Sequence, residues 1–400
     1  MFIHFFGLLI FTYIFIRLIR PLPLRWWFKL SYAGITFLAT QIHFLQKHFL
    51  GGLAAPEIPG WLIMTMGWAF GSMMVLACAL LLRDFLLLLS YTFSKGERIR
   101  QAILSPLNSS FMVMFSTFIC AVGVWRAVSF PTVTETELYF DKLPPAFDGY
   151  SIVHLTDLHT SRLLPESWLG EVFRRTNFLN PDLVLITGDL IDGTPEHRRR
   201  DIRSFKLLNA PDGVWASLGN HEYYSGLDNW LNAFESISLP VLINQNIRIK
   251  HGTDEIVIAA VTDEAAARFG EDMPDIDKAL AHTNEDDMII LMSHRPTNTQ
   301  KNAAKGVSLQ LSGHTHGGQI TVLNLVTKFA NGGFLKGLYK IGDMFLYQNR
   351  GAGVWGGLPI RIGIESEIAH ITLRSKKAKA ESDTTSASTN QAIALDKTDN

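Results

Sequence analysis

Uncharged apolar stretches in the first third of the chain constrain its fold more than any other feature. Three of them are long enough to cross a bilayer, because a spanning helix needs about 20 mainly apolar residues. They cover residues 1–15, continued to Ile19 past Arg17, residues 58–82 and residues 103–125. A fourth stretch, 27–45, contains Lys29, Gln41 and His43 and fits either a spanning helix or a helix at the membrane surface; we expect it to span. The sequence therefore predicts an α-helical membrane anchor of about four helices over residues 1–130.

Basic residues between these stretches set the expected orientation. Arg17, Arg20, Arg25 and Lys29 surround the first connection, Arg83, Lys95, Arg98 and Arg100 lie in the third, and the second holds only Lys47 and Glu57. Because cytoplasmic loops are rich in Lys and Arg, both basic clusters should face the cytoplasm, with an even number of spans between them. We predict a multi-pass protein of the cytoplasmic (inner) membrane with everything after Trp125 outside the cytoplasm. A cleaved signal peptide is the alternative for the first stretch, but that stretch lacks a charged start and a small-residue cleavage site.

The rest of the chain has the composition of a soluble domain. The formal net charge of the whole chain is -1, so no basic surplus points to nucleic acid as a partner. Cys78 and Cys120 both lie in apolar stretches, which leaves the remainder without a disulfide or a thiolate metal site. We predict a folded domain over residues 132–374. Residues 375–400 are polar and have no apolar period, so we expect a disordered tail.

Short apolar runs alternate with helical patterns through most of this domain. The runs have the length and composition of buried strands; they are residues 151–155, 183–186, 213–218, 256–261, 288–292 and 308–311. Helical patterns lie between them, for example at 168–179 and 229–236. Strands alternating with helices favour an α/β domain. The Gly-rich stretch 319–373 has little helical pattern and indicates a second, more antiparallel sheet.

Five polar clusters follow the ends of predicted strands, which is the edge where ligands bind in open α/β sheets. They are Asp157-Leu158-His159, Gly188-Asp189-Leu190-Ile191-Asp192, Gly219-Asn220-His221-Glu222, Ser293-His294-Arg295 and Gly313-His314-Thr315-His316. Each cluster alone is weak, because an Asp or Asn after a strand is commonly a turn residue. Five in succession, each with a histidine or carboxylate, indicate a metal site.

The spacing within the clusters supports that interpretation. Residues i and i+2 of an extended chain point the same way, so Asp157 and His159 can face one cavity, as can His314 and His316. Carboxylate, imidazole and amide oxygen without thiolate suit manganese, iron or zinc. Asp189 is a carboxylate that could bridge two cations, and two metals about 3.5–4 Å apart can clamp a phosphoryl group.

In these residues the sequence resembles the calcineurin-like metallophosphoesterase superfamily, whose pattern D-x-H, G-D-x-x-D, G-N-H-[DE], H, G-H-x-H is intact here in order. The match extends from Asp157 to His316. Two later segments, Gly317-Gly318-Gln319 and Leu346-Tyr347-Gln348-Asn349-Arg350-Gly351, resemble the membrane-associated bacterial branch with YkuE- and YaeI-like phosphodiesterases. The resemblance implies a four-layer αββα sandwich for residues 132–374.

The resemblance also implies a role for each matching residue. Asp157, His159 and His316 would hold one divalent metal ion, Asn220, His294 and His314 would hold the other, and Asp189 would bridge them. The ions would be Mn²⁺, Zn²⁺ or Fe. His221 would donate a proton to the leaving oxygen or stabilise the transition state, and Asp192 would orient it. Glu222 is a further candidate for that supporting role.

The implied reaction is hydrolysis of a phosphomonoester, phosphodiester or pyrophosphate by in-line attack of a metal-bound hydroxide. The substrate would be a phosphate-containing small molecule or a lipid-linked phosphate, and the anchor's partner would be the lipid bilayer. One alternative is a pyrophosphatase of the UDP-diacylglucosamine type, which the outward orientation disfavours because such lipids are made on the cytoplasmic side. A metal-binding membrane sensor without turnover is another, but every motif residue is present. Transport is disfavoured because the predicted spans hold no buried charge.

Several other polar residues leave two interpretations open. His154 precedes the first cluster within a strand, and we expect a structural role for it. Tyr223 and Tyr224 either shape the substrate mouth or pack in the core or at the rim. Arg295 and Arg350 either contact substrate or form ordinary ion pairs.

Overall fold

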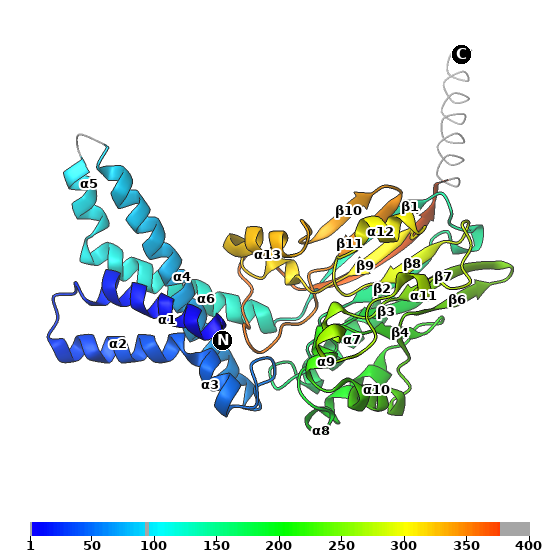
Figure 1. The fold of residues 1–400 in the computed structure, drawn as a ribbon, viewed down its shortest axis with the longest axis horizontal. Coiled ribbons are helices and arrows are strands. Elements are labelled where there is room, and N and C mark those ends of the chain that lie inside the picture. The colour runs from blue at the N-terminus through cyan, green and yellow to red at the C-terminus, as the bar shows by residue number, and fades with distance from the viewer. Residues whose placement is uncertain (1, 93–95, 377–400) are drawn as a thin grey trace, which may run out of the picture.

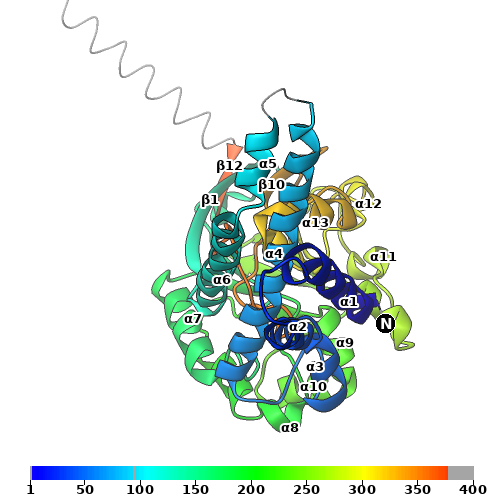
Figure 2. The ribbon, with the colours of Figure 1, turned by 90° about the vertical axis from the view of Figure 1, so that its left-hand side faces the viewer.

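The computed structural model describes residues 2–92 and 96–376, and it consists of a helical region followed by a region with two β-sheets (Figure 1). The last helix of the first region is α6 (Pro106–Val128), and the first strand, β1 (Thr132–Phe140), begins four residues later. Viewed from the helical side, the helices lie in front of the sheets (Figure 2). From position 377 the predicted tail lies outside the described residues, and Ser375 is the last residue of strand β12 (Glu367–Ser375).

Two of the described helices are long and apolar enough to cross a membrane, which are α4 and α6. The other elements of this region are α1 (Phe2–Ile14), the π-helical turn Phe15–Ile19, α2 (Trp26–Thr40), α3 (Ile42–Phe49) and α5 (Gly96–Ile103), and α4 itself covers Gly60–Ser90. The prediction of about four spans is therefore wrong in number.

The two missing spans fail for different reasons. The first apolar stretch gives a helix from Phe5 to Ile19 that is too short to qualify. The stretch 27–45 breaks at Gln41, and the 15 residues of α2 cover about 22 Å, short of the roughly 30 Å hydrocarbon core. Beyond the break, two buried polar side chains of α3 bind backbone of the sheet region: His43 contacts the carbonyl of Gly357 and Gln46 that of Gly356. These polar residues serve packing against the sheet region.

The sheet region contains two mixed six-stranded sheets. The first has the order β1-β12-β2-β3-β4-β5, and the second has the order β10-β11-β9-β8-β7-β6. Their remaining strands are β2 (Ser151–Leu155), β3 (Leu183–Thr187), β4 (Val214–Ser217), β5 (Val241–Leu242), β6 (Gln245–His251), β7 (Asp254–Ala260), β8 (Ile289–Met292), β9 (Leu309–Ser312), β10 (Gly337–Ile341) and β11 (Met344–Gln348). The helices that flank them are α7 (Glu166–Phe178), α8 (Pro195–Arg198), α9 (Asn220–Tyr224), α10 (Leu227–Ser236), α11 (Ile276–Ala279), α12 (Thr299–Ala304) and α13 (Asn324–Ala330).

The expectation for residues 319–373 holds only in part. This stretch does contain an antiparallel hairpin, β10 with β11, but it does not form a sheet of its own. Strand β11 pairs in parallel with β9, and β12 returns to the first sheet between β1 and β2. Glycine content and short strands indicated the hairpin, whereas the partner of each strand is set by pairing over long sequence distances.

Three apolar clusters lie between the layers of sheets and helices. Ile152 and Leu185 of the first sheet pack against Ile258 and Leu311 of the second, so one core lies between the sheets. Side chains on the other face of the first sheet pack against α7 and α10, for example Phe173 and Trp230, and the outer face of the second sheet packs against α11. The order is helix, sheet, sheet, helix, as in the expected sandwich.

A loop of the sheet region enters the helical region. Ile360 is fully buried in a cluster with Phe70 and Cys120 of the long helices, and Pro359 lies against Gly67. The backbone N–H of Arg361 donates to the carbonyl of Gly123 in α6 at 2.9 Å. The two regions are thus packed together through residues 353–364, which lie in the connection between β11 and β12.

Candidate metal centre

The five polar clusters lie in loops at one edge of the paired sheets. Asp157 follows β2, Asp189 follows β3, Asn220 begins α9 after β4, His294 follows β8 and His314 follows β9. Strands β2, β3 and β4 run parallel to one another, as do β7, β8 and β9, so their carboxyl ends meet at this edge. The structure brings together the seven residues expected as metal ligands.

Backbone strain is concentrated in these loops. Five of the seven expected ligands have a positive φ, which non-glycine residues rarely adopt. The values are 52° at Asp157, 46° at His159, 52° at Asp189, 69° at His314 and 49° at His316. Each such conformation costs on the order of 1–3 kcal/mol and is characteristic of functional sites. The packing around these loops compensates the strain, and the side chains converge on a common point.

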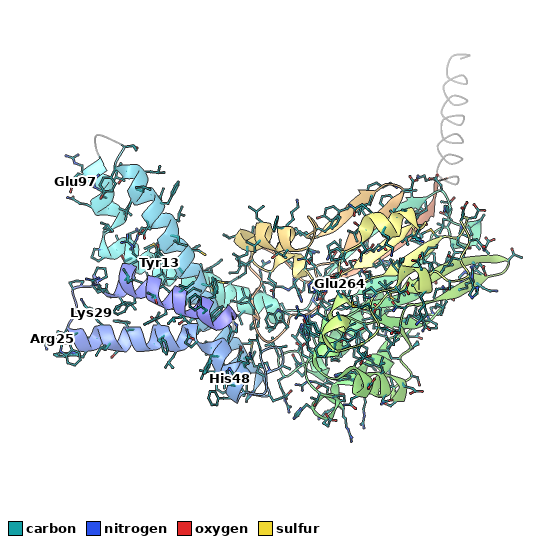
Figure 3. All side chains as sticks on the ribbon, in the orientation of Figure 1. Tyr13, Arg25, Lys29, His48, Glu97 and Glu264 are labelled. Atoms are coloured by element: carbon teal, nitrogen blue, oxygen red, sulfur yellow. The ribbon has the colours of Figure 1, made fainter. Side chains whose placement is uncertain are left out.

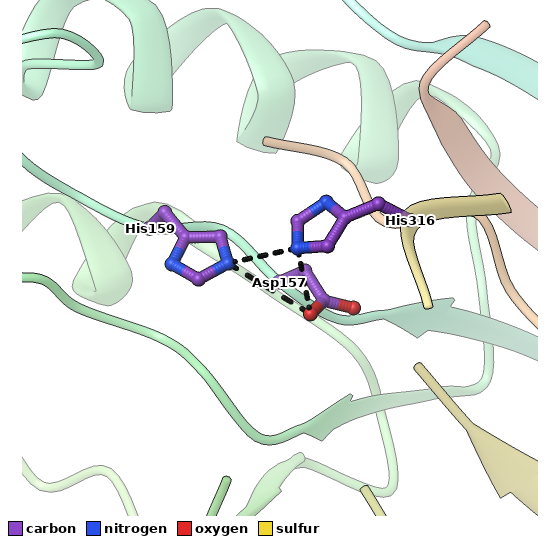
Figure 4. Close-up of side chains that lie close together, drawn as sticks. All are labelled: Asp157, His159 and His316. Atoms are coloured by element: carbon purple, nitrogen blue, oxygen red, sulfur yellow. Dashed lines mark hydrogen bonds and ion pairs between the residues drawn. The ribbon is translucent and has the colours of Figure 1, made fainter. Parts of the chain in front are cut away.

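Asp157, His159 and His316 form the first group of candidate ligands (Figure 4). The Oδ1 atom of Asp157 lies 3.3 Å from His316 Nε2 and 3.8 Å from His159 Nε2. The two imidazole nitrogens face each other at 3.1 Å. One carboxylate oxygen and two ring nitrogens therefore converge on a volume the size of one cation.

Asp189, His294 and His314 form a second group. His294 Nε2 lies 3.2 Å from Asp189 Oδ2, and the same carboxylate oxygen lies 3.8 Å from His159 Nε2 of the first group. Asn220 is buried beside this group, and its Oδ1 accepts a hydrogen bond from Arg295 at 3.2 Å. Asp189 thus reaches both groups, and Asp157 Oδ1 of the first group lies 4.0 Å from His294 Nε2 of the second.

His221 and Asp192 form a pair next to Asp189. The Nδ1 atom of His221 contacts Asp192 Oδ1, while its Nε2 lies 3.8 Å from Asp189 Oδ2. Asp192 Oδ1 also lies 3.2 Å from His159 Nδ1, so one carboxylate orients two imidazoles. Burial lowers the pKa of His221 in the metal-free chain, but Asp189 and Asp192 raise it to about 9. The arrangement favours a protonated ring facing the centre.

Two glycines allow the loops to approach this closely. A Cβ on Gly219 would lie 2.3 Å from Asp189 Oδ1, and one on Gly313 would lie 2.1 Å from Thr156 Oγ1 and 2.3 Å from Asp157 Oδ2. Both contacts are far inside van der Waals distance. Any larger residue at either position would displace a candidate ligand.

The donor set fits divalent cations. Asp157 and Asp189 are almost fully buried, and buried carboxylates are costly unless a positive charge compensates them. Among the described residues, the Nε2 atom of His294 has no hydrogen-bond partner, although a carboxylate oxygen lies 3.2 Å away. Burial lowers the pKa of His294 and the carboxylates of Asp189 and Asp157 raise it, to about 10 overall in the metal-free chain. Buried carboxylates and imidazoles without thiolate suit manganese, iron or zinc.

Arg295 lies beside the centre and also forms the ion pair that was the simpler of its two interpretations. Its guanidinium pairs with Asp263 at 2.8 Å and lies 2.9 Å from His314 Nε2. Arg350 forms an ion pair with Glu367 at 3.0 Å. Tyr224 is half-exposed with its ring 5.3 Å from that of His221, so it lies at the rim.

Glu222 supports the backbone of the site. Its carboxylate accepts hydrogen bonds from the N–H groups of Gly219 at 2.7 Å, Leu190 at 2.8 Å and Asp189 at 3.1 Å. His154 lies buried in β2, and burial lowers its pKa to about 3. It stays neutral, in keeping with the structural role expected for it.

Arg361 and Trp355 were not expected from the sequence. Arg361 is completely buried, and its guanidinium lies 3.3 Å from both the carbonyl oxygen and the Nδ1 of His316. The Trp355 ring lies 6.4 Å from that of His221. A lone arginine in the apolar run Leu358-Pro359-Ile360-Arg361-Ile362 was the available signal, because a buried charge needs a partner.

Comparison with known proteins places this centre in a family. The model of the calcineurin-like phosphoesterase family matches residues 150–318. An uncharacterized metallophosphoesterase of Campylobacter jejuni is 30% identical over 368 residues, which cover 92% of this chain and 95% of that protein. A transmembrane protein with metallophosphoesterase domain from Bos taurus is 33% identical over 67% of this chain and 63% of its own length. The metallophosphoesterase YkuE of Bacillus subtilis is 32% identical over 60% of this chain and 85% of its length.

The relative from Campylobacter jejuni matches along almost its entire length, and the family match covers all five polar clusters. The chain therefore belongs to the calcineurin-like metallophosphoesterase family and is a metal-dependent phosphoester hydrolase.

Proposed function

We propose that the chain is a membrane-anchored phosphoesterase with two divalent metal ions, acting on a phosphomonoester, phosphodiester or pyrophosphate. The position of Asp189 carries the proposal, because its Oδ2 lies 3.8 Å from His159 and 3.2 Å from His294, one imidazole of each ligand group. Asp157, His159 and His316 would hold one ion, and Asn220, His294 and His314 the other, with Asp189 shared. When bound, the ions supply positive charge for the phosphoryl oxygens and acidify coordinated water.

The residues around the ions have separable tasks. His221 holds a proton at Nε2, the ring nitrogen that faces the centre, and delivers it to the leaving oxygen. Asp192 fixes that orientation by binding His221 Nδ1. Arg295 reaches the His314 side of the centre and binds a phosphoryl oxygen there. A positioned general acid contributes roughly 10²–10⁴-fold to rate.

Hydrolysis by the full-length chain tests this assignment. The chain, purified in detergent and stripped of metal, is assayed on an aryl phosphodiester and an aryl phosphomonoester after addition of Mn²⁺, Zn²⁺ or Fe²⁺. We expect His221→Ala to lower kcat by about 10²–10⁴-fold while metal content stays at two ions per chain. His282→Asn changes an exposed histidine outside the centre and should leave kcat and metal content unchanged. A wild-type chain that binds metal but is inert with every ion would favour the sensor interpretation.

We infer that residues 1–130 anchor the enzyme through α4 and α6, and that residues 132–374 form the phosphoesterase domain outside the cytoplasm. Arg25 and Lys29 lie at the end of the helical region that points away from the sheets, as does Glu97 of α5 (Figure 3). Arg17 reaches the same end by pairing with Asp84, near the C-terminus of α4, at 2.6 Å. Basic residues at this end support a cytoplasmic location for it.

A compartment-sensitive reporter tests the orientation. Fused after the C-terminus of the full chain, alkaline phosphatase should be active and a cytoplasm-dependent fluorescent protein dark. The reverse pattern would place the metal centre in the cytoplasm and restore nucleotide-linked lipids as substrates.

A further inference from the structure

The segment that follows metal-site residue His316 presents an apolar stripe to the outside of the molecule. Residues 321–330 form a 3-10 turn and then α13. Val322, Leu325, Val326, Phe329 and Ala330 recur at the spacing of one helix face and are all exposed, Phe329 by 91%. In a soluble domain such a stripe is the face that packs on the core. Here it is covered by nothing in the described residues.

The opposite side of this segment is fixed to the helical region. Ile320 is buried in the apolar cluster of α4 and α6, and Leu323 packs against the same cluster. Thr321 donates from both its N–H and its hydroxyl to the carbonyl of Ile362, at 3.1 and 3.0 Å. Figures 1 and 2 both place α13 at the end of the sheet region that faces the helices. The stripe is therefore held next to the two helices that can span a membrane.

The charge around the stripe selects a lipid surface over a protein partner. From Gln319 to Gly342 there is no acidic residue, and the cations are Lys328, Lys336 and Lys340. Apolar side chains with flanking lysines are characteristic of helices that lie in the interface of an anionic bilayer. Large exposed side chains also continue along the neighbouring helix α6, where Phe118 is 68% exposed.

The same segment is joined to the metal centre. His316 begins the turn that leads into it, and the hydroxyl of Thr315, between the two histidines of the last motif, donates to the carbonyl of Leu335 at 2.7 Å. A shift of α13 would therefore move the loop that carries His314 and His316.

We propose that α13 lies in the headgroup region of the bilayer, as a second membrane contact separate from the spanning helices, and holds the metal centre at the lipid surface. The proposal rests on the proposed anchoring by α4 and α6. A site held in this way is suited to substrates whose phosphate sits at the surface of a membrane.

Quenching by lipid-attached nitroxides tests the contact without measuring turnover. Single cysteines replace Phe329, Phe118 or Phe178 in a chain carrying Cys78→Ala and Cys120→Ala, and each is labelled with the fluorophore bimane. The full chains are reconstituted into vesicles of phosphatidylcholine and phosphatidylglycerol, with or without a nitroxide near the top of the acyl chain. Phe178 is the matched control, because it is 80% exposed at the end of α7 in the sheet region.

We expect the labels at positions 329 and 118 to be quenched to a similar extent and the label at 178 to be unaffected. Quenching at 118 without quenching at 329 would overturn the proposal and leave the anchor intact. Absence of quenching at both positions would overturn the anchor as well. If the emission of the label at 329 changes with protein concentration but not with nitroxide, the membrane contact of α13 is overturned. The stripe would then bind a second copy of the chain. Leu325→Asp with Phe329→Asp provides a second measurement, since it should weaken quenching of a label at Val322→Cys.

Discussion

Arg361 connects helix α6 to the candidate metal ligand His316. Its backbone N–H binds the carbonyl of Gly123 in α6 at 2.9 Å, and its guanidinium lies 3.3 Å from the carbonyl oxygen and the Nδ1 of His316. The same guanidinium donates to the carbonyls of Gly353 at 2.8 Å and Arg350 at 2.9 Å. One buried side chain thus contacts three backbone carbonyls from two loops around a candidate ligand.

Arg361→Lys should therefore reduce metal occupancy although it keeps the charge. A lysine ammonium cannot reproduce the planar fork, and each buried group left without a partner costs about 1–3 kcal/mol. We expect the variant to retain fewer than two ions per chain, measured by elemental analysis after dialysis, and to unfold at lower temperature. Arg162→Lys, which changes a half-exposed arginine paired with Glu57, is the control. Full metal content in Arg361→Lys would contradict the bracing role.

The grouping of the candidate ligands could be predicted from the sequence because the motifs that place them are local. The candidate ligands follow the ends of strands, and the carboxyl ends of parallel strands always lie at the same edge of a sheet. Asp157 and His159 needed only the spacing of neighbouring residues to be placed together. The helix, sheet, sheet, helix order followed from the resemblance carried by the same motifs.

The parts that sequence reasoning missed depend on contacts between distant residues. Hydropathy together with the distribution of basic residues made residues 27–45 a predicted span. Neither pattern registers the break at Gln41 or the bonds from His43 and Gln46 to the loop near Gly357. Arg361 was missed for the same reason, since its partners lie in α6 and in the loop after β9. The positive φ values of the candidate ligands also arise from the folded loops. They could not be predicted from the sequence, because these residues are not glycines.

Gly67→Ala should destabilise the packing of the two regions. A Cβ at this position of α4 would lie 2.4 Å from Cγ and 2.8 Å from Cδ of Pro359, whose ring cannot turn away. We expect a loss of about 1–3 kcal/mol from overpacking, seen as a lower midpoint of thermal unfolding in detergent.

Gly34→Ala is the matched control for that substitution. Nothing lies within 4 Å of a Cβ at this position of α2, so alanine should be neutral or stabilising by about 0.5–1 kcal/mol. Equal midpoints for the two variants would show that Pro359 is not seated against α4.

Metal binding should release protons and tighten as pH rises. In the metal-free chain Asp189 raises the pKa of His294 to about 10 and that of His221 to about 9, against the burial that lowers both. A cation at His294 needs the neutral ring, so at pH 7 binding must displace a proton. Calorimetric titration of the stripped chain with Mn²⁺ in buffers of different ionisation enthalpy should show net proton release. Heats that are independent of the buffer would contradict a protonated His294.

The same pKa values fix the sign of a stability effect in the stripped chain. Both histidines have folded-state pKa values above the ordinary 6.5, so their contribution is complete below pH 6.5 and is lost as pH rises through 9 to 10. We expect the unfolding temperature of the metal-free chain to fall over that window. The part of the effect that comes from His294 should disappear when metal is bound, because the cation then replaces its proton as the partner of Asp189.

Asp192→Asn should have a wider effect than removal of His221. The Oδ1 atom of Asp192 contacts His221 Nδ1 and lies 3.2 Å from His159 Nδ1, so it orients both the proposed proton donor and a proposed metal ligand. An asparagine with its amide oxygen in this position still accepts from both rings, but it carries no negative charge and therefore holds both imidazoles less strongly. Second partners of metal-binding histidines are typically worth 10–100-fold in affinity or activity. We therefore expect Asp192→Asn to lower both kcat and the affinity for metal, whereas His221→Ala lowers kcat alone. Equal metal affinity in the two variants would show that His159 does not depend on Asp192 for its orientation.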